Sequence, residues 1–100
     1  MVVNVQFVKM QTSEFMETFV LKELKKLGKK FNWVIRADVF FQLEKDPKGK
    51  GKICKVKLSL PGSRITAISN EESFQAATDE TIRDLKKQLE KRKSDMKSYL

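Results

Sequence analysis

The spacing of the apolar residues switches between two periods along this chain, and that switching constrains the fold more than any other feature. Val3, Val5 and Phe7 alternate with polar residues, as in a strand that buries one face. From Met16 to Phe31 the apolar residues instead recur every three or four positions, as in an amphipathic helix. The chain therefore opens with a predicted strand followed by a predicted helix.

Three further strands are predicted after this helix. Strict alternation marks residues 36–44 and 53–60, and the segment 45–52 between them contains Gly, Pro and Lys but no apolar residue, so it is predicted to be an exposed hairpin loop. Pro61-Gly62 is a suitable central pair for a type II turn, which places a fourth strand at about 64–69. Both connections are short, so these three strands should be antiparallel.

Start signals are present for both helices. Thr12 and Ser13 are good N-caps for the first helix, which should run from about Ser13 to Phe31. Asn70 is predicted to cap the second helix, with Glu71-Glu72 as acids in its first turn, and this helix should reach about Lys97. Its apolar face consists of Phe74, Thr78, Ile82, Leu85 and Leu89.

The order strand, helix, strand, strand, strand, helix predicts one α+β domain over residues 1–100, because no repeat or linker divides the chain. A right-handed helical crossover makes the first two strands parallel, which gives a four-stranded mixed sheet with both helices on one face. The other face would meet water, although Phe40 and Ile68 fall on it. The helix, three strands and helix that follow the first strand of this β-α-β-β-β-α order have the layout of a double-stranded-RNA-binding domain. Residues 98–100 are expected to be flexible.

The residue inventory argues against catalysis. The chain has no His and one Cys, so zinc sites, thiol-imidazole pairs and hydroxyl-imidazole triads cannot be assembled. The 13 acids are scattered among lysines without paired spacing. We therefore expect no enzyme activity, no metal, no cofactor and no small-molecule substrate.

The compartment follows from similar arguments. The first residues lack the basic and apolar regions of a signal peptide, and no window approaches the roughly 20 apolar residues of a membrane span. A lone Cys54 cannot form an internal disulfide. The sequence predicts a cytoplasmic protein without a membrane partner.

The charge is strongly positive and is concentrated on the two predicted helices. The formal net charge is +8, which favours polyanionic partners. The basic residues expected to contact RNA phosphates are Lys22, Lys25, Lys26, Lys29, Lys30, Arg83, Lys86, Lys87, Lys91, Arg92 and Lys93. Two basic helices on one sheet face would form a continuous surface for phosphates, although a basic helix can also serve solubility alone.

Two known RNA-binding architectures fit less well in detail. The second helix of a double-stranded-RNA-binding domain normally presents lysines at its start, and none is present here. An RNA-recognition motif would need a strand after its last helix and base-stacking aromatics in two signature segments. Neither is found in this chain.

Two segments of the second helix carry a family resemblance. They are Phe74-Gln75-Ala76-Ala77-Thr78-Asp79 and Gln88-Leu89-Glu90-Lys91-Arg92-Lys93. The first helix is similar too, through Phe19, Val20, Leu24, Lys26, Leu27 and Phe31. In these residues and in the order of its elements, the chain resembles the ribosome hibernation-promoting factors, also called the sigma modulation or ribosome-associated inhibitor family.

The resemblance implies a stress-response factor that binds the small ribosomal subunit and its ribosomal RNA, occupies the messenger and transfer RNA channel, and inhibits translation. It implies a short form, without the C-terminal dimerisation domain of long members, and leaves open whether ribosomes are paired or held singly. Glu23 and Asp84 depart from the pattern, because the family is expected to carry basic residues there.

A second hypothesis comes from another functional class. The chain could be a protein-interaction module that docks an acidic partner through its sheet face, with the basic helices providing solubility and steering. This reading explains Phe40 and Ile68 better than RNA binding by the helices does.

Overall fold

A computed structural model describes residues 1–97, so the predicted flexible end at 98–100 lies outside the described residues. The elements in chain order are β1 (Val2–Val8), α1 (Glu14–Lys30), β2 (Arg36–Leu43), β3 (Lys52–Leu60), β4 (Ser63–Glu71) and α2 (Phe74–Lys97). The predicted α+β class and the order β-α-β-β-β-α are confirmed.

The sheet is mixed and its strands stand in the order β1-β2-β3-β4. β1 pairs in parallel with β2, whereas β2 with β3 and β3 with β4 are antiparallel, as predicted. One row of paired residues crosses all four strands on the buried face, and it consists of Val5, Val39, Val56 and Ala67. This register sends the alternate residues, Phe40 and Ile68 among them, to the opposite face.

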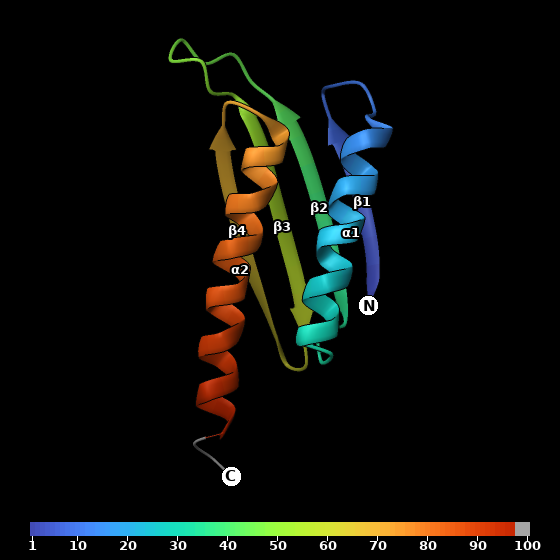
Figure 1. The fold of residues 1–100 in the computed structure, drawn as a ribbon, viewed down its shortest axis with the longest axis vertical. Helices are drawn as coiled ribbons and strands as arrows, with labels where there is room; N and C mark the ends of the chain where they lie inside the picture. Colours follow the sequence, from blue (N-terminus) through green and yellow to red (C-terminus); the bar gives the residue numbers. More distant parts are fainter. Residues whose placement is uncertain (98–100) are drawn as a thin grey trace.

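Both helices cover the same face of the sheet and run in the same direction (Figure 1). α1 lies in front of β1 and β2, and α2 lies in front of β3 and β4. α2 also packs against α1 and continues past the end of the sheet (Figure 1). The two carboxyl-terminal halves, which carry most of the lysines, therefore lie at the same end of the molecule.

The core lies between the helices and the sheet. Leu24 from α1, Phe41 and Leu58 from the sheet, and Leu85 from α2 are fully buried. Burying one such side chain stabilises the fold by roughly 1.5–3 kcal/mol. Buried polar groups in the core form hydrogen bonds. The hydroxyl of Thr81 donates to the Cys54 carbonyl at 3.0 Å, which links α2 to β3.

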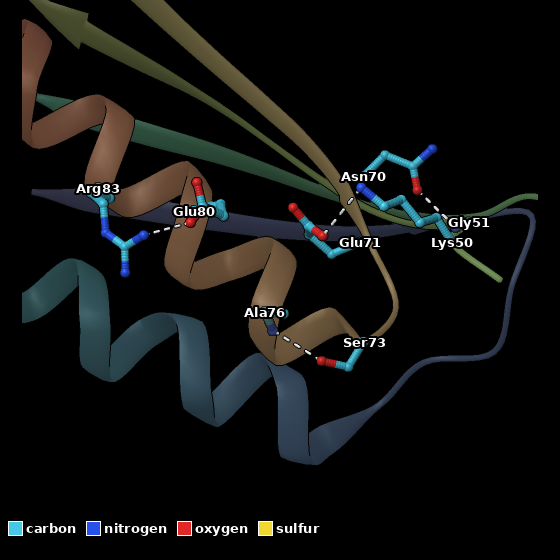
Figure 2. Close-up of polar contacts among 8 residues, drawn as sticks. All are labelled: Lys50, Gly51, Asn70, Glu71, Ser73, Ala76, Glu80 and Arg83. Atoms are coloured by element: carbon cyan, nitrogen blue, oxygen red, sulfur yellow. Dashed lines mark hydrogen bonds and ion pairs between the residues drawn. The ribbon is translucent and has the colours of Figure 1, made fainter. Parts of the chain in front are cut away.

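The predicted start of α2 is wrong. Asn70 and Glu71 belong to β4, because pairing with β3 continues as far as Lys52 and Glu71 and keeps the backbone extended. The helix begins at Phe74 after Ser73, whose Oγ accepts a hydrogen bond from the Ala76 amide at 3.0 Å (Figure 2). The first turn of α2 consequently contains no acid.

Asn70 has a different role from the predicted cap. Its Oδ1 accepts a hydrogen bond from the buried Gly51 amide at 2.7 Å, and the neighbouring Glu71 lies 3.7 Å from Lys50 (Figure 2). The prediction that the whole of 45–52 is an exposed loop is therefore wrong at its end. Gly51 also pairs through its carbonyl with the Glu44 amide at 2.8 Å, which closes the hairpin.

Candidate nucleic-acid interface

All eleven basic residues predicted to contact RNA are exposed. The side of α1 that faces the sheet is formed by Met16, Val20, Leu24 and Leu27, at spacings of three and four residues. This buried stripe turns Lys22, Lys25, Lys26 and Lys29 away from the core. Sequence periodicity therefore placed these side chains on the surface correctly, while their contact with RNA stays a prediction.

An ion pair joins the two helices. Lys30 Nζ lies 2.9 Å from Glu90 Oε1, and both side chains are about half exposed, at 55% and 54%. The hydrogen bond from Lys30 holds the pKa of the Glu90 carboxyl below its usual value, with help from its charge and those of Lys86 and Lys93. Lys30 is therefore less available to phosphate than its exposure alone implies.

Glu23 faces the groove between the helices. It lines a small hollow of about 190 Å³ together with Asp79, Arg83 and Lys86. Its carboxylate lies 3.6 Å from Lys26, and its side chain is 24% exposed. This departure from the expected family pattern thus lowers the positive potential inside the groove.

Acids also offset one cation of α2. The guanidinium of Arg83 forms an ion pair with Glu80 one turn earlier (Figure 2). Asp84, the second departure, is exposed on the same helix. The charge of the predicted surface is therefore uneven, because acids pair with Lys26, Lys30 and Arg83.

The basic residues of α2 point to two sides of the helix. Arg83, Lys86 and Lys93 line hollows between α2 and α1. Lys91 and Arg92 instead line a larger cavity on the β4 side, where Arg92 donates to Ser63 Oγ at 2.7 Å. The basic side chains of α2 are thus divided between two surfaces, one facing α1 and one facing β4.

The open face of the sheet carries cations that the predicted site does not include. Lys55 and Lys57 on β3 alternate with buried residues, and Lys57 Nζ lies 5.8 Å from the centre of the Phe40 ring. Arg36 forms an ion pair with Asp38 at 3.0 Å, and this guanidinium lowers the pKa of the Asp38 carboxyl. Strand alternation was the signal that could have identified these positions as a second charged surface.

No group of three or more Cys, Asp or Glu side chains within residues 1–97 is arranged to hold a metal ion. Neither helix of that region is long and apolar enough to cross a membrane.

Comparison with solved structures shows the same fold elsewhere. A ribosomal subunit interface protein from Coxiella burnetii superposes with a TM-score of 0.83 at 22% identity, covering 94% of this chain and 99% of that chain. The N-terminal domain of Protein Y from Thermus thermophilus gives a TM-score of 0.76 at 19% identity, covering 91% of this chain and 98% of that chain. At these identities the likeness establishes the fold.

Sequence comparison establishes the family. No curated protein matches the chain. The family described as sigma 54 modulation protein / S30EA ribosomal protein matches residues 3–97, which is nearly the whole described chain. That family consists of ribosome-associated factors and is not an enzyme family. The resemblance seen in the two helices is confirmed: this chain belongs to the sigma 54 modulation protein / S30EA ribosomal protein family.

Proposed function

We propose that this chain binds the small ribosomal subunit by holding ribosomal RNA phosphates with the exposed cations of α1 and α2. The observation that carries the proposal is the placement of eleven exposed basic side chains on two helices that lie side by side on one sheet face. Lysine and arginine on such a surface displace the counterions of RNA, and this release drives association. Specificity would come from the shape of the RNA rather than from its base sequence.

The inhibition in this proposal comes from occupancy. A factor bound in the messenger and transfer RNA channel blocks translation by excluding those RNAs, and it needs no catalytic group. The description of the family as ribosomal supports action on the ribosome, as does the similar fold of a ribosomal subunit interface protein from Coxiella burnetii. Such a factor acts in the cytosol, where ribosomes translate, during stress.

The test is cosedimentation with ribosomes and separated subunits at low and moderate salt. The wild-type protein should migrate with the small subunit, and Lys91→Glu/Lys93→Glu should remain at the top of the gradient. The matched control is Lys55→Glu/Lys57→Glu, because it makes the same change in charge on the open face of the sheet. The logarithm of the association constant should fall with the logarithm of salt concentration by about 0.7–0.9 per phosphate contacted.

A flat salt response, or equal loss of binding in both charge-reversed proteins, would contradict the proposed interface. Equal loss would mean that net charge alone governs association. Translation in a cell-free extract provides a second readout, in which wild-type protein inhibits and Lys91→Glu/Lys93→Glu does not.

A second candidate function is docking of an acidic protein on the open face of the sheet. Ile68 is 61% exposed there, and it shares a cross-strand row with Lys55 and Phe40. The combination of apolar and cationic side chains favours an acidic partner with apolar anchors. This second function is supported if Phe40→Ser or Ile68→Ser abolishes association with the acidic partner while Lys91→Glu/Lys93→Glu retains that association.

A further inference from the structure

One cavity lies beside the carboxyl-terminal half of α2, on the β4 side. It has a volume of about 590 Å³ and is bounded by the carboxyl-terminal half of α2, the turn at Pro61 and the segment that contains Trp33. Lys91 and Arg92 line it, whereas Arg83, Lys86 and Lys93 do not. A volume of this size lies within the range of roughly 300–1,000 Å³ that is usual for small-molecule sites.

One wall of the cavity is apolar and aromatic. Leu60, Pro61 and Ile65 contribute aliphatic surface beside the indole of Trp33. The indole meets the fully buried Phe31 ring edge-on, with the ring centroids 6.1 Å apart and an interplanar angle of 87°. Packing against Phe31 thus restrains Trp33, and an indole that lines a cavity is a group against which a base can stack.

Two cations also line the cavity. Arg92 donates one hydrogen bond to Ser63 Oγ at 2.7 Å, and both of these residues belong to the lining. A guanidinium has five N–H donors, so donors remain for an oxyanion. Lys91 adds a second, exposed cation, and these two outnumber Asp95, the single acid of the lining.

We propose that this cavity binds a nucleotide, with the base against Trp33 and the apolar wall and the phosphate at Arg92 and Lys91. The aromatic wall and the two cations match the two chemically different parts of a nucleotide, and neither part alone would use both. A free nucleotide and a nucleotide within single-stranded RNA share this chemistry. The inference rests on the proposed function only in treating RNA as one of the two sources.

Trp33 is the only tryptophan of the chain, so its fluorescence reports directly on the cavity. The titrants are AMP, GMP, a single-stranded RNA tetranucleotide, and ribose 5-phosphate as a phosphate without a base. Both mononucleotides or the tetranucleotide should quench Trp33 saturably, and ribose 5-phosphate should not. Binding of mononucleotides identifies a free nucleotide as ligand, whereas binding of the tetranucleotide alone identifies RNA.

Two substitutions test the two cations without altering the reporter. Arg92→Gln and Lys91→Gln should each weaken binding about fivefold or more. Lys45→Gln and Lys48→Gln are matched controls, because they remove the same charge from the loop between β2 and β3, outside both the cavity and the proposed RNA-binding residues, and should leave binding unchanged.

The aromatic wall is tested by Trp33→Leu, with binding followed by NMR shifts of the Ser63 and Gln88 amides, which belong to residues that line the cavity. Loss of stacking should weaken binding about fivefold or more, and Trp33→Phe should recover part of it. The retained aromatic ring in Trp33→Phe controls for a folding defect, as does a thermal melt of each variant.

The nucleotide proposal is overturned if no titrant quenches Trp33 saturably, or if Arg92→Gln and Lys45→Gln weaken binding equally. Cosedimentation of the same proteins with ribosomes separates this failure from failure of the proposed function. A chain that binds ribosomes but no nucleotide contradicts only the cavity assignment, and one that binds AMP but no ribosome contradicts only the ribosomal role.

Discussion

Lys30 Nζ and Glu90 Oε1 form a 2.9 Å ion pair between α1 and α2, although the two residues are 60 positions apart in the sequence. Each side chain remains about half exposed, so solvent and salt screen their attraction. The pair therefore matters less for holding the helices together than for the charge that the interhelical groove presents to a polyanion.

Replacing Glu90 by Gln should strengthen association with ribosomes, because it releases Lys30 and raises the net charge by one. If Lys30 then contacts a phosphate, the salt dependence steepens by about 0.7–0.9 in log-log slope. Lys30→Gln should weaken association. Sedimentation binding across a salt series measures both effects, and thermal unfolding should show nearly equal midpoints for the wild type and the two variants.

Ser73→Ala should destabilise the amino-terminal turn of α2 by about 0.5–2 kcal/mol, because the Ala76 amide loses its acceptor. Hydrogen exchange of the Ala76 amide should accelerate while that of Gly51 stays unchanged. Asn70→Ala should have the reverse pattern, since Asn70 Oδ1 accepts from the Gly51 amide. Faster exchange of Ala76 in Asn70→Ala would show that Asn70 caps the helix after all.

Gly51→Ala should cost at least about 2–4 kcal/mol in free energy of unfolding. The φ angle at Gly51 is +123°, and an added Cβ would lie 2.2 Å from the Glu44 carbonyl oxygen, which is backbone and cannot move aside easily. Gly49→Ala is the matched control, because its φ is +85° but no atom lies within 4 Å of its added Cβ. Urea denaturation should show only about 1–2 kcal/mol for the control.

The Cys54 thiol should resist modification until the protein unfolds. Burial raises its pKa from 9.0 to about 11. At pH 8 a thiol reagent should therefore react slowly with native protein and rapidly in denaturant. Rapid labelling of native protein at pH 8 would contradict the buried environment.

The same group should make the fold less stable in alkali. The folded pKa is raised, so the stabilisation is complete below pH 9.0 and is lost as pH rises through about 11. The loss attributable to Cys54 is on the order of 2–3 kcal/mol. Comparison with Cys54→Ala isolates it, because the many lysines titrate equally in both proteins.

The elements that sequence reasoning predicted well are those decided by nearby residues. α1 combines a regular apolar stripe with a Ser13 cap, and the structure shows the Ser13 side chain accepting from the Met16 amide. The turn at Pro61-Gly62 needs a positive φ at its second residue, and Gly62 has a φ of +77°. Such local requirements are visible in a few consecutive letters.

The errors arose where distant pairing overrode a local signal. Asn70 followed by two acids has the composition of a helix start, but the β3–β4 ladder keeps Asn70 and Glu71 extended. Likewise, Gly51 was predicted to lie in a solvated loop, whereas it is buried and forms hydrogen bonds with Asn70 and Glu44. No property of a short segment reveals a partner nineteen residues away.

For the candidate site, helical periodicity predicted the exposure of the basic residues but not their neighbours. That Lys30 meets Glu90, or that Arg92 reaches Ser63, depends on how α1, α2 and β4 pack in space. The cavity beside Trp33 likewise forms from three segments that are separate in the sequence. Its existence could be recognised only after the fold was known.

The agreement between strand order in the sheet and strand order in the chain has a consequence for how the protein folds. β2, β3 and β4 are joined by short hairpins, so they can pair early with little loss of loop entropy. β1 can join β2 only after the chain has closed the long α1 crossover, and it then gains a neighbour on one side alone. We therefore expect β1 to enter the sheet after β2, β3 and β4 have paired, and α1, with five of the eleven proposed RNA-binding cations, to dock in that same step.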